Sequence, residues 1–243
     1  MGATVVGILI KNDDFSITKS GGILVGVGPD RTNDKAINTK LSNAFKWSFD
    51  RVFAAAALIF FLPFILVISA IILIKDGRPI FFGHTRVGKD GKVFKCLKFR
   101  TMVRDADKRI AHILATDPNA ALEWHSTQKL ENDPRIHCAG KFLRKTSLDE
   151  LPQFINVLRG EMSMVGPRPI VADEAKQYGE HYKDYLSVRP GITGLWQVSG
   201  RSDTSYSERV ALDVEYVNNH NMLQDLSIVG KTVSVVLSCN GAR

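Results

Sequence analysis

A run of 23 residues without a charged side chain, Val52 to Ile74, constrains the fold of this chain more than any other feature. It exceeds the roughly 18 residues that identify a candidate membrane helix, and it leaves no polar face for water. The alternative is a buried core helix, but such helices are normally shorter. We therefore predict a membrane-embedded helix over residues 46–75.

Positive residues flank this run on both sides, with Lys46 and Arg51 before it and Lys75 and Arg78 after it. Because positive residues mark the cytoplasmic side of a membrane segment, both ends are expected to be cytoplasmic. Pro63 lies near the middle, where it removes a backbone donor and can bend the helix. We predict a re-entrant helix broken at Pro63, and an ordinary kinked span remains the alternative.

Charge and cysteine content indicate the compartment and the partners. The chain carries 32 Lys and Arg against 25 Asp and Glu, and residues 75–109 alone account for an excess of seven positive charges. A basic segment beside a membrane helix favours anionic lipid headgroups, and no base-stacking aromatic pattern supports nucleic-acid binding. Cys96, Cys138 and Cys239 form no C-x-x-C pair, which favours a reducing compartment. Residues 1–45 contain no export signal, so we expect a polar N-terminal extension.

The remaining residues, 76–243, predict a small, mostly helical cytoplasmic domain of the α+β class. Asp90-Gly91 lies between two strand-like segments, which is a hairpin signal. Helical patterns follow, some with apolar faces suited to the membrane surface. The expected strands are residues 79–82 and 93–99, and the expected helices are residues 102–115, a short helix opened by the S-x-x-E pattern at Ser147, residues 205–219 and residues 226–237.

Two adjacent carboxylates, Asp149 and Glu150, are the candidate catalytic groups. Pro152 is tolerated only near the first turn of a helix, so the two acids are expected at or beside a helix N-terminus. Acidic residues there also complement the helix dipole, which is the plain structural explanation. Arg144 precedes the pair and Arg168, between two prolines, follows it, and stiffly held guanidinium groups suit phosphate binding. A rigid turn with an exposed arginine is the alternative for Arg168.

Together these residues suit reaction at a phosphoanhydride. One carboxylate could attack phosphorus, and the other could hold a metal or manage a proton. A Mg²⁺ ion held by Asp149 and Glu150 would offset the repulsion between the acids and an anionic diphosphate. We add Lys98 and Arg100 to the expected substrate-binding set, together with Arg201, which follows a Gly-containing turn.

Five ordered motifs lie between Lys46 and the C-terminus. They are Phe81-Phe82 with Arg86-Val87-Gly88, Lys98-Phe99-Arg100-Thr101-Met102, residues 143–153 around Ser147-Leu148-Asp149-Glu150-Leu151-Pro152, Gly166-Pro167-Arg168-Pro169, and residues 189–197 beginning Arg189-Pro190-Gly191. In these motifs the chain resembles the bacterial sugar transferases, the monotopic polyprenyl-phosphate phosphoglycosyltransferases, in their compact exopolysaccharide-initiating form.

The resemblance implies a re-entrant membrane helix and a ping-pong reaction at the bacterial inner membrane, with the catalytic domain facing the cytoplasm. Asp149 would attack the β-phosphate of a UDP-sugar, release UMP and pass the phosphosugar, galactose or glucose phosphate, to undecaprenyl phosphate. Mg²⁺ near the dyad is implied as well. Small family members place Ser-Pro at the helix break, whereas Leu62 precedes Pro63 here, and residues 1–45 match no part of the family.

Two other functions remain open at this stage: a non-enzymatic module that binds anionic lipids, and a glycosyltransferase that releases UDP. The sequence does not specify the sugar or the oligomeric state, and a homo-oligomer is compatible with it.

Overall fold

The computed structural model describes residues 16–20, 23–27, 31–127, 130, 133–200 and 204–238. The chain divides into two compact units, Met1–Lys46 and Trp47–Arg243. The first holds an antiparallel hairpin of β1 (Ser16–Ser20) and β2 (Ile23–Val27) and the beginning of α1 (Arg31–Asp76). The second holds the rest of α1 and all the candidate site residues that the structure describes.

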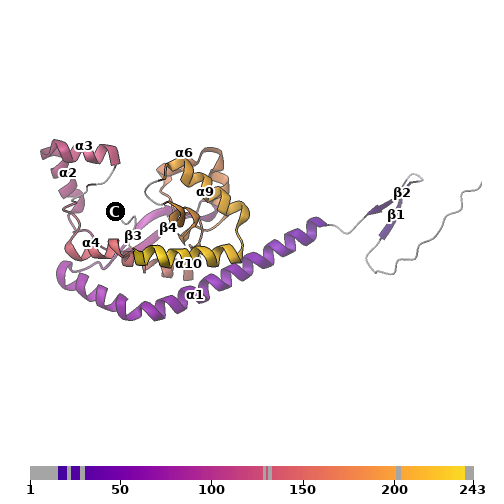
Figure 1. Cartoon of the computed structure of the whole chain (residues 1–243), viewed down its shortest axis with the longest axis horizontal. Coiled ribbons are helices and arrows are strands. Elements are labelled where there is room, and N and C mark those ends of the chain that lie inside the picture. Colours follow the sequence, from indigo (N-terminus) through magenta and orange to yellow (C-terminus); the bar gives the residue numbers. More distant parts are fainter. Residues whose placement is uncertain are drawn as a thin grey trace, which may run out of the picture. The chain divides into compact units, whose positions relative to one another are not determined.

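Short helices and a few short strands make up the second unit, which confirms the coarse expectation of a mostly helical α+β domain with a hairpin (Figure 1). The strands are β3 (Phe81–Val87), β4 (Val93–Phe99), β5 (Ser163–Val165) and β6 (Gly191–Thr193). The helices after α1 are α2 (Ala106–Thr116), α3 (Pro118–Thr127), α4 (Cys138–Lys145), α5 (Gln153–Leu158), α6 (Ala175–Tyr178), α7 (Tyr182–Ser187), α8 (Leu195–Ser199), α9 (Tyr206–Asn219) and α10 (Met222–Ser238). The 3₁₀ turns among the described residues are η1 (Lys89–Gly91), η2 (Leu148–Glu150), η3 (Ala172–Glu174) and η4 (Gly179–His181).

The β3–β4 hairpin forms where the Asp-Gly signal predicts it. Asp90 and Gly91 both adopt positive φ, 56° and 74°, which lets the chain reverse within the 3₁₀ turn. The strands are antiparallel, with Phe82 opposite Lys98, His84 opposite Cys96 and Arg86 opposite Phe94. The expected first strand began too early, because β3 starts at Phe81 and continues to Val87.

The predicted break at Pro63 is not present, because helix α1 continues through this residue as one helix. One stripe of α1 packs on the domain, from Asp50 at one end to Ile72 near the other. Its members recur three, four or seven residues apart, as one face of a helix requires. They are Asp50, Ala54, Phe61, Ile65, Ile68 and Ile72.

The opposite side of α1 exposes large apolar side chains, including Ile59 at 75% and Ile74 at 83% exposure. Residues Ala44–Asp76 have the length and composition of a membrane helix, and only 11% of their most apolar window is buried in the protein. Apolar side chains are also exposed on helices packed beside α1, namely Phe142 on α4 and Leu223 and Leu226 on α10 (Figure 1). Exposed apolar side chains on these three helices fit association with a membrane.

Both ends of the buried stripe are fixed by polar contacts. Ser163 donates a hydrogen bond of 2.6 Å to the Asp50 carboxylate, and both residues are buried. At the other end Arg100 donates to the carbonyl oxygens of Asp76 and Gly77, at 3.1 and 2.7 Å. The carbonyls at a helix C-terminus lack partners within the helix, so a buried guanidinium satisfies them well.

Three sequence-based expectations about helices are settled by these bounds. Helix α2 begins at Ala106 rather than Met102, because Met102 forms an isolated antiparallel bridge with Ile136. The capping box of Ser205 and Glu208 is present at the start of α9. The last helix, α10, begins earlier than expected, at Met222.

Candidate active site

The two acids lie in the 3₁₀ turn η2, between α4 and α5. Asp149 is buried at 7% exposure, whereas about a third of the Glu150 side chain is exposed. The predicted S-x-x-E cap at Ser147 is wrong, because Ser147 adopts a left-handed conformation, φ 56°, and its side chain makes no capping bond. The acids therefore lie just before α5 rather than inside its first turn, with Pro152 directly preceding that helix.

Lys98, on β4, faces both acids. Its Nζ lies 2.6 Å from Glu150 Oε1 and 3.8 Å from Asp149 Oδ2. Burial disfavours the Lys98 charge, but the carboxylates of Glu150 and Asp149 outweigh this effect and raise its pKa above the usual value. Lys98 is thus a fixed cation at the dyad.

Asp149 lies in an environment that opposes its own charge. Burial raises the pKa of Asp149 from 3.8 to about 6, Lys98 and Arg144 act in the opposite direction, and the neighbouring Glu150 adds to the increase. A desolvated carboxylate with a raised pKa is common among catalytic groups. The two acids therefore differ in environment, with one buried and one at the surface.

Asn156 sets the distance between Lys98 and the dyad, and sequence reasoning missed it. This side chain, 0% exposed, lies on α5, which follows the dyad. It donates to Lys95 O at 2.8 Å and accepts from Leu97 N at 3.0 Å, so it ties α5 to the strand that carries Lys98. No local pattern reveals such a contact, since the partners are about 60 residues apart in the chain.

The predicted substrate-binding arginines fall in different places. Arg144 is exposed, lies close enough to Asp149 to influence its pKa, and donates from Nε to Thr101 Oγ1 at 2.9 Å. Arg100 is buried against the end of α1, as described above. Arg168 is exposed, and its guanidinium lies 5.6 Å from the centre of the Trp196 ring. Arg201 lies outside the described residues.

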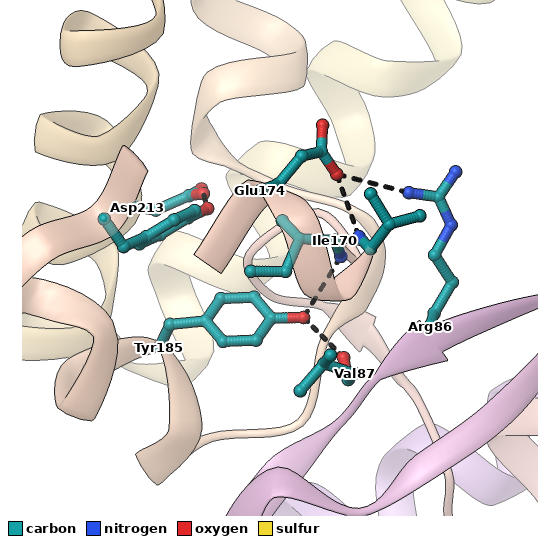
Figure 2. Close-up of polar contacts among 8 residues, drawn as sticks. Arg86, Val87, Ile170, Glu174, Tyr185 and Asp213 are labelled. Carbon is teal, nitrogen blue, oxygen red and sulfur yellow. Dashed lines mark hydrogen bonds and ion pairs between the residues drawn. The ribbon is translucent and has the colours of Figure 1, made fainter. Parts of the chain in front are cut away.

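Arg86, which was not among the predicted site residues, lies near Arg168. Figure 2 shows it extending from β3 toward Glu174, whose Oε2 lies 3.4 Å from Arg86 Nη1. Burial lowers the pKa of Arg86, and the positive charge of Arg168 lowers it further. The sequence feature that could have identified Arg86 as a site residue is its place in the Arg86-Val87-Gly88 motif.

The dyad fits a Mg²⁺ ion that is completed by substrate. Mg²⁺ is usually held by one or two carboxylates together with phosphate oxygens and water. Glu150 offers an accessible carboxylate, and Asp149 lies directly beside it in the same turn. Among the described residues no group of three or more His, Cys, Asp or Glu side chains forms a ready-made metal site.

The comparisons with known proteins match this site and the helix beside it. The model of the bacterial sugar transferase family matches residues 41–239. The chain therefore belongs to the bacterial sugar transferase family. This membership confirms the resemblance stated above and makes the chain an enzyme.

Three of the similar proteins are 40 to 50% identical to the chain over the aligned residues. The exopolysaccharide production protein ExoY of Rhizobium meliloti is 50% identical over 197 residues, 81% of this chain and 87% of that protein. The undecaprenyl-phosphate galactose phosphotransferase of Salmonella typhimurium is 48% identical over 83% of this chain and 42% of its own length. The UDP-glucose:undecaprenyl-phosphate glucose-1-phosphate transferase of Escherichia coli is 40% identical over 76% of this chain and 38% of its own length.

Proposed function

We propose that this sugar transferase moves a sugar 1-phosphate, of galactose or glucose, from a UDP-sugar to undecaprenyl phosphate and releases UMP. The names of the Salmonella typhimurium and Escherichia coli relatives support the acceptor and the two sugars. The name of the Rhizobium meliloti relative supports a role in exopolysaccharide production, for which this transfer would be the first membrane step. The observation that carries the proposal is a buried carboxylate, Asp149, between two cations beside an apolar helix.

In the first step an Asp149 carboxylate oxygen attacks the β-phosphorus of the UDP-sugar. The bond from that phosphorus to the oxygen bridging the two phosphates breaks, and UMP leaves with the electron pair. Lys98 and Arg144, both within electrostatic reach of Asp149, stabilise the negative charge that gathers on the transferred phosphate. In the second step an oxygen of undecaprenyl phosphate attacks the same phosphorus and restores the Asp149 carboxylate.

Glu150 would share with Asp149 the binding of Mg²⁺, which when bound supplies positive charge to the diphosphate. The exposed position of Glu150 suits it to this role, because it can reach a metal at the surface of the site while Asp149 remains the buried nucleophile. Lys98 contacts both acids, and its positive charge favours the ionised form of the nucleophile Asp149.

The contacts of α1 support the proposal that both of its ends lie on the cytoplasmic face. Asp50 and Asp76 are 26 residues apart, roughly 39 Å of helix, which is longer than the hydrocarbon core. Both ends are nevertheless bonded to one domain. A transverse span would draw that domain, with the charged dyad packed against α1, into the bilayer at high cost. A helix that enters and leaves by one face avoids this cost.

The test uses the full chain in detergent or nanodiscs with Mg²⁺, a panel of UDP-sugars and undecaprenyl phosphate. We expect UMP as the released nucleotide, and with donor alone a phosphosugar adduct on Asp149 detected by mass spectrometry. Asp149→Asn is expected to lose both, whereas Asp173→Asn, an exposed carboxylate in η3, is expected to retain both. Release of UDP instead of UMP would show that the sugar alone is transferred. Binding of anionic lipids without any nucleotide release would favour the non-enzymatic module.

A further inference from the structure

Arg86 is held in place by a carboxylate that is itself fixed by the backbone. Glu174 Oε2 accepts from the backbone N–H of Val171 at 2.9 Å and lies 3.4 Å from Arg86 Nη1 (Figure 2). The Arg86 side chain is 16% exposed. A guanidinium that is partly buried and oriented by a bound carboxylate is a preorganised anion-binding group.

A second contact fixes the distance between Arg86 and Arg168. Tyr185 Oη donates to Val87 O at 2.6 Å and accepts from Ile170 N at 3.3 Å (Figure 2). Val87 and Ile170 also form an antiparallel bridge. Val87 directly follows Arg86, and Ile170 lies two residues after Arg168. The end of β3 and the Pro-Arg-Pro segment are therefore locked together.

Few of the hydrogen-bond donors of the two guanidinium groups are used within the described part of the chain. The Arg86 side chain has Glu174 as its only hydrogen-bond partner among the described residues. Arg168 makes no hydrogen bond to any residue in the part of the chain that the structure describes, although its guanidinium lies over Trp196. The positive charge of Arg168 lowers the pKa of Arg86, which places the two cations within electrostatic range of each other. The positive charge of Arg168 also acts on the carboxylate of Asp213. Because neither Glu174 nor Asp213 is hydrogen-bonded to Arg168, its donors remain available to an anionic ligand.

The hairpin register places Arg86 on the same face of the sheet as Lys98, which contacts the dyad. Lys98 pairs with Phe82, and Arg86 lies four residues further along β3, roughly 13 Å away at the usual rise per residue. The buried Cys96 thiol lies between them, opposite His84. The pKa of Cys96 is raised to about 11, chiefly by burial, and the charges that act on it include both Lys98 and Arg86. Two positive charges, Lys98 beside the dyad and Arg86 further along β3, thus lie in a row on one face of the hairpin.

We propose that Arg86 and Arg168 bind the nucleotide half of the donor, the α-phosphate and its nucleoside, with Glu174 as the residue that positions Arg86. This inference rests on the proposed function, which brings the β-phosphorus to Asp149 at the other end of the row. A nucleoside diphosphate sugar is extended, so its nucleotide lies away from the reacting phosphorus. The arginine pair leaves the transferred phosphate to Lys98 and Arg144.

The test measures UMP binding, because UMP has no β-phosphate and no sugar. Isothermal titration uses the full chain with Arg86 intact, the Arg86→Gln variant, and Lys92→Gln as a control that removes an exposed positive charge from the hairpin turn. Loss of one charge-assisted hydrogen-bonding group should weaken UMP binding about 10- to 100-fold. The control should bind UMP normally. Equal UMP affinity in Arg86→Gln and the native chain overturns the inference.

Steady-state kinetics separates this inference from the proposed function. We expect Arg86→Gln to raise the KM for the UDP-sugar while the KM for undecaprenyl phosphate stays unchanged. A rise in the acceptor KM alone would assign Arg86 to the lipid phosphate and overturn the inference, although Asp149-dependent UMP release would persist. If the native chain neither binds UMP nor releases it, the proposed function fails and the inference fails with it.

Glu174→Gln tests the positioning role. Glutamine retains an acceptor for the Val171 N–H but loses the charge that holds Arg86. We expect a higher KM for the UDP-sugar with little change in kcat. A lower melting temperature with an unchanged donor KM would show that Glu174 serves the fold alone.

Discussion

Replacing Asp149 by Asn should stabilise the folded protein at neutral pH, because the native carboxylate lies where its charge is disfavoured. Burial raises the pKa of Asp149 from 3.8 to about 6 despite the opposing charge of Lys98. A shift of roughly two units means that ionised Asp149 weakens the folded state by about 3 kcal/mol. Asparagine has nearly the same shape and carries no charge, so it removes this penalty.

The size of the gain depends on pH, in a direction set by the raised pKa of Asp149. Below the pKa of the unfolded carboxyl the group is protonated in both states and costs nothing. The penalty grows as the pH rises, and it is complete above the folded pKa of about 6. Between pH 5 and pH 7.5 the native chain should lose about 1.4 kcal/mol relative to Asp149→Asn. This corresponds to roughly 3–6 °C in Tm.

Thermal unfolding of the native chain, Asp149→Asn and the surface control Asp173→Asn at pH 5, 6 and 7.5 measures this difference. Burial also raises the pKa of Asp213 to about 6, but Asp213 titrates in all three proteins and its effect cancels. The Tm gap between Asp149→Asn and the native chain should widen with pH, and the gap for Asp173→Asn should not. A gap that stays constant from pH 5 to pH 7.5 would refute the reasoning.

Three further predictions concern the same domain. Lys98→Met removes a charge that favours ionised Asp149, so the pH of half-maximal UMP release with donor alone should move upward; an unchanged midpoint would contradict this. Asn156→Leu leaves two backbone groups of β4 without buried partners, at a cost of about 1–3 kcal/mol each, and should lower the urea unfolding midpoint; native-like stability would show that the bonds are dispensable. With the native cysteines replaced, Ser48→Cys and Arg78→Cys should both be labelled from the cytoplasmic side; labelling from opposite sides would mean a single span.

Local patterns were sufficient for several elements. The charge-free run identified α1 because length and composition alone mark such a helix, and the Asp90-Gly91 pair located the hairpin turn because few residues adopt positive φ readily. The adjacent acids and Pro152 located the dyad beside the start of α5. In each case neighbouring residues determine the structure.

Long-range contacts determine the features that the sequence patterns did not predict, namely the turn at Ser147 and the directions of the Arg100 and Lys98 side chains. Ser147 has the S-x-x-E pattern of a helix cap, but Leu148 and Leu151 pack toward α1, and the chain forms a 3₁₀ turn between two helices instead. Arg100 stands in a motif shared with Lys98, yet the two side chains diverge, one to the end of α1 and the other to the dyad. Partners of this kind are remote in sequence and leave no spacing to recognise.

The packing of the dyad turn on α1 has a consequence for where the enzyme can work. Phe154, at the start of α5, stacks with Phe61 of α1 at 6.5 Å between ring centres, and Leu151 joins the same cluster. If α1 lies in lipid as we propose, the packing of Phe154 and Leu151 on α1 that supports the dyad turn forms fully only at the bilayer. A chain that has not reached the membrane would then react slowly with the UDP-sugar, because Asp149 and Glu150 would not be held in place by the packing of their turn on α1.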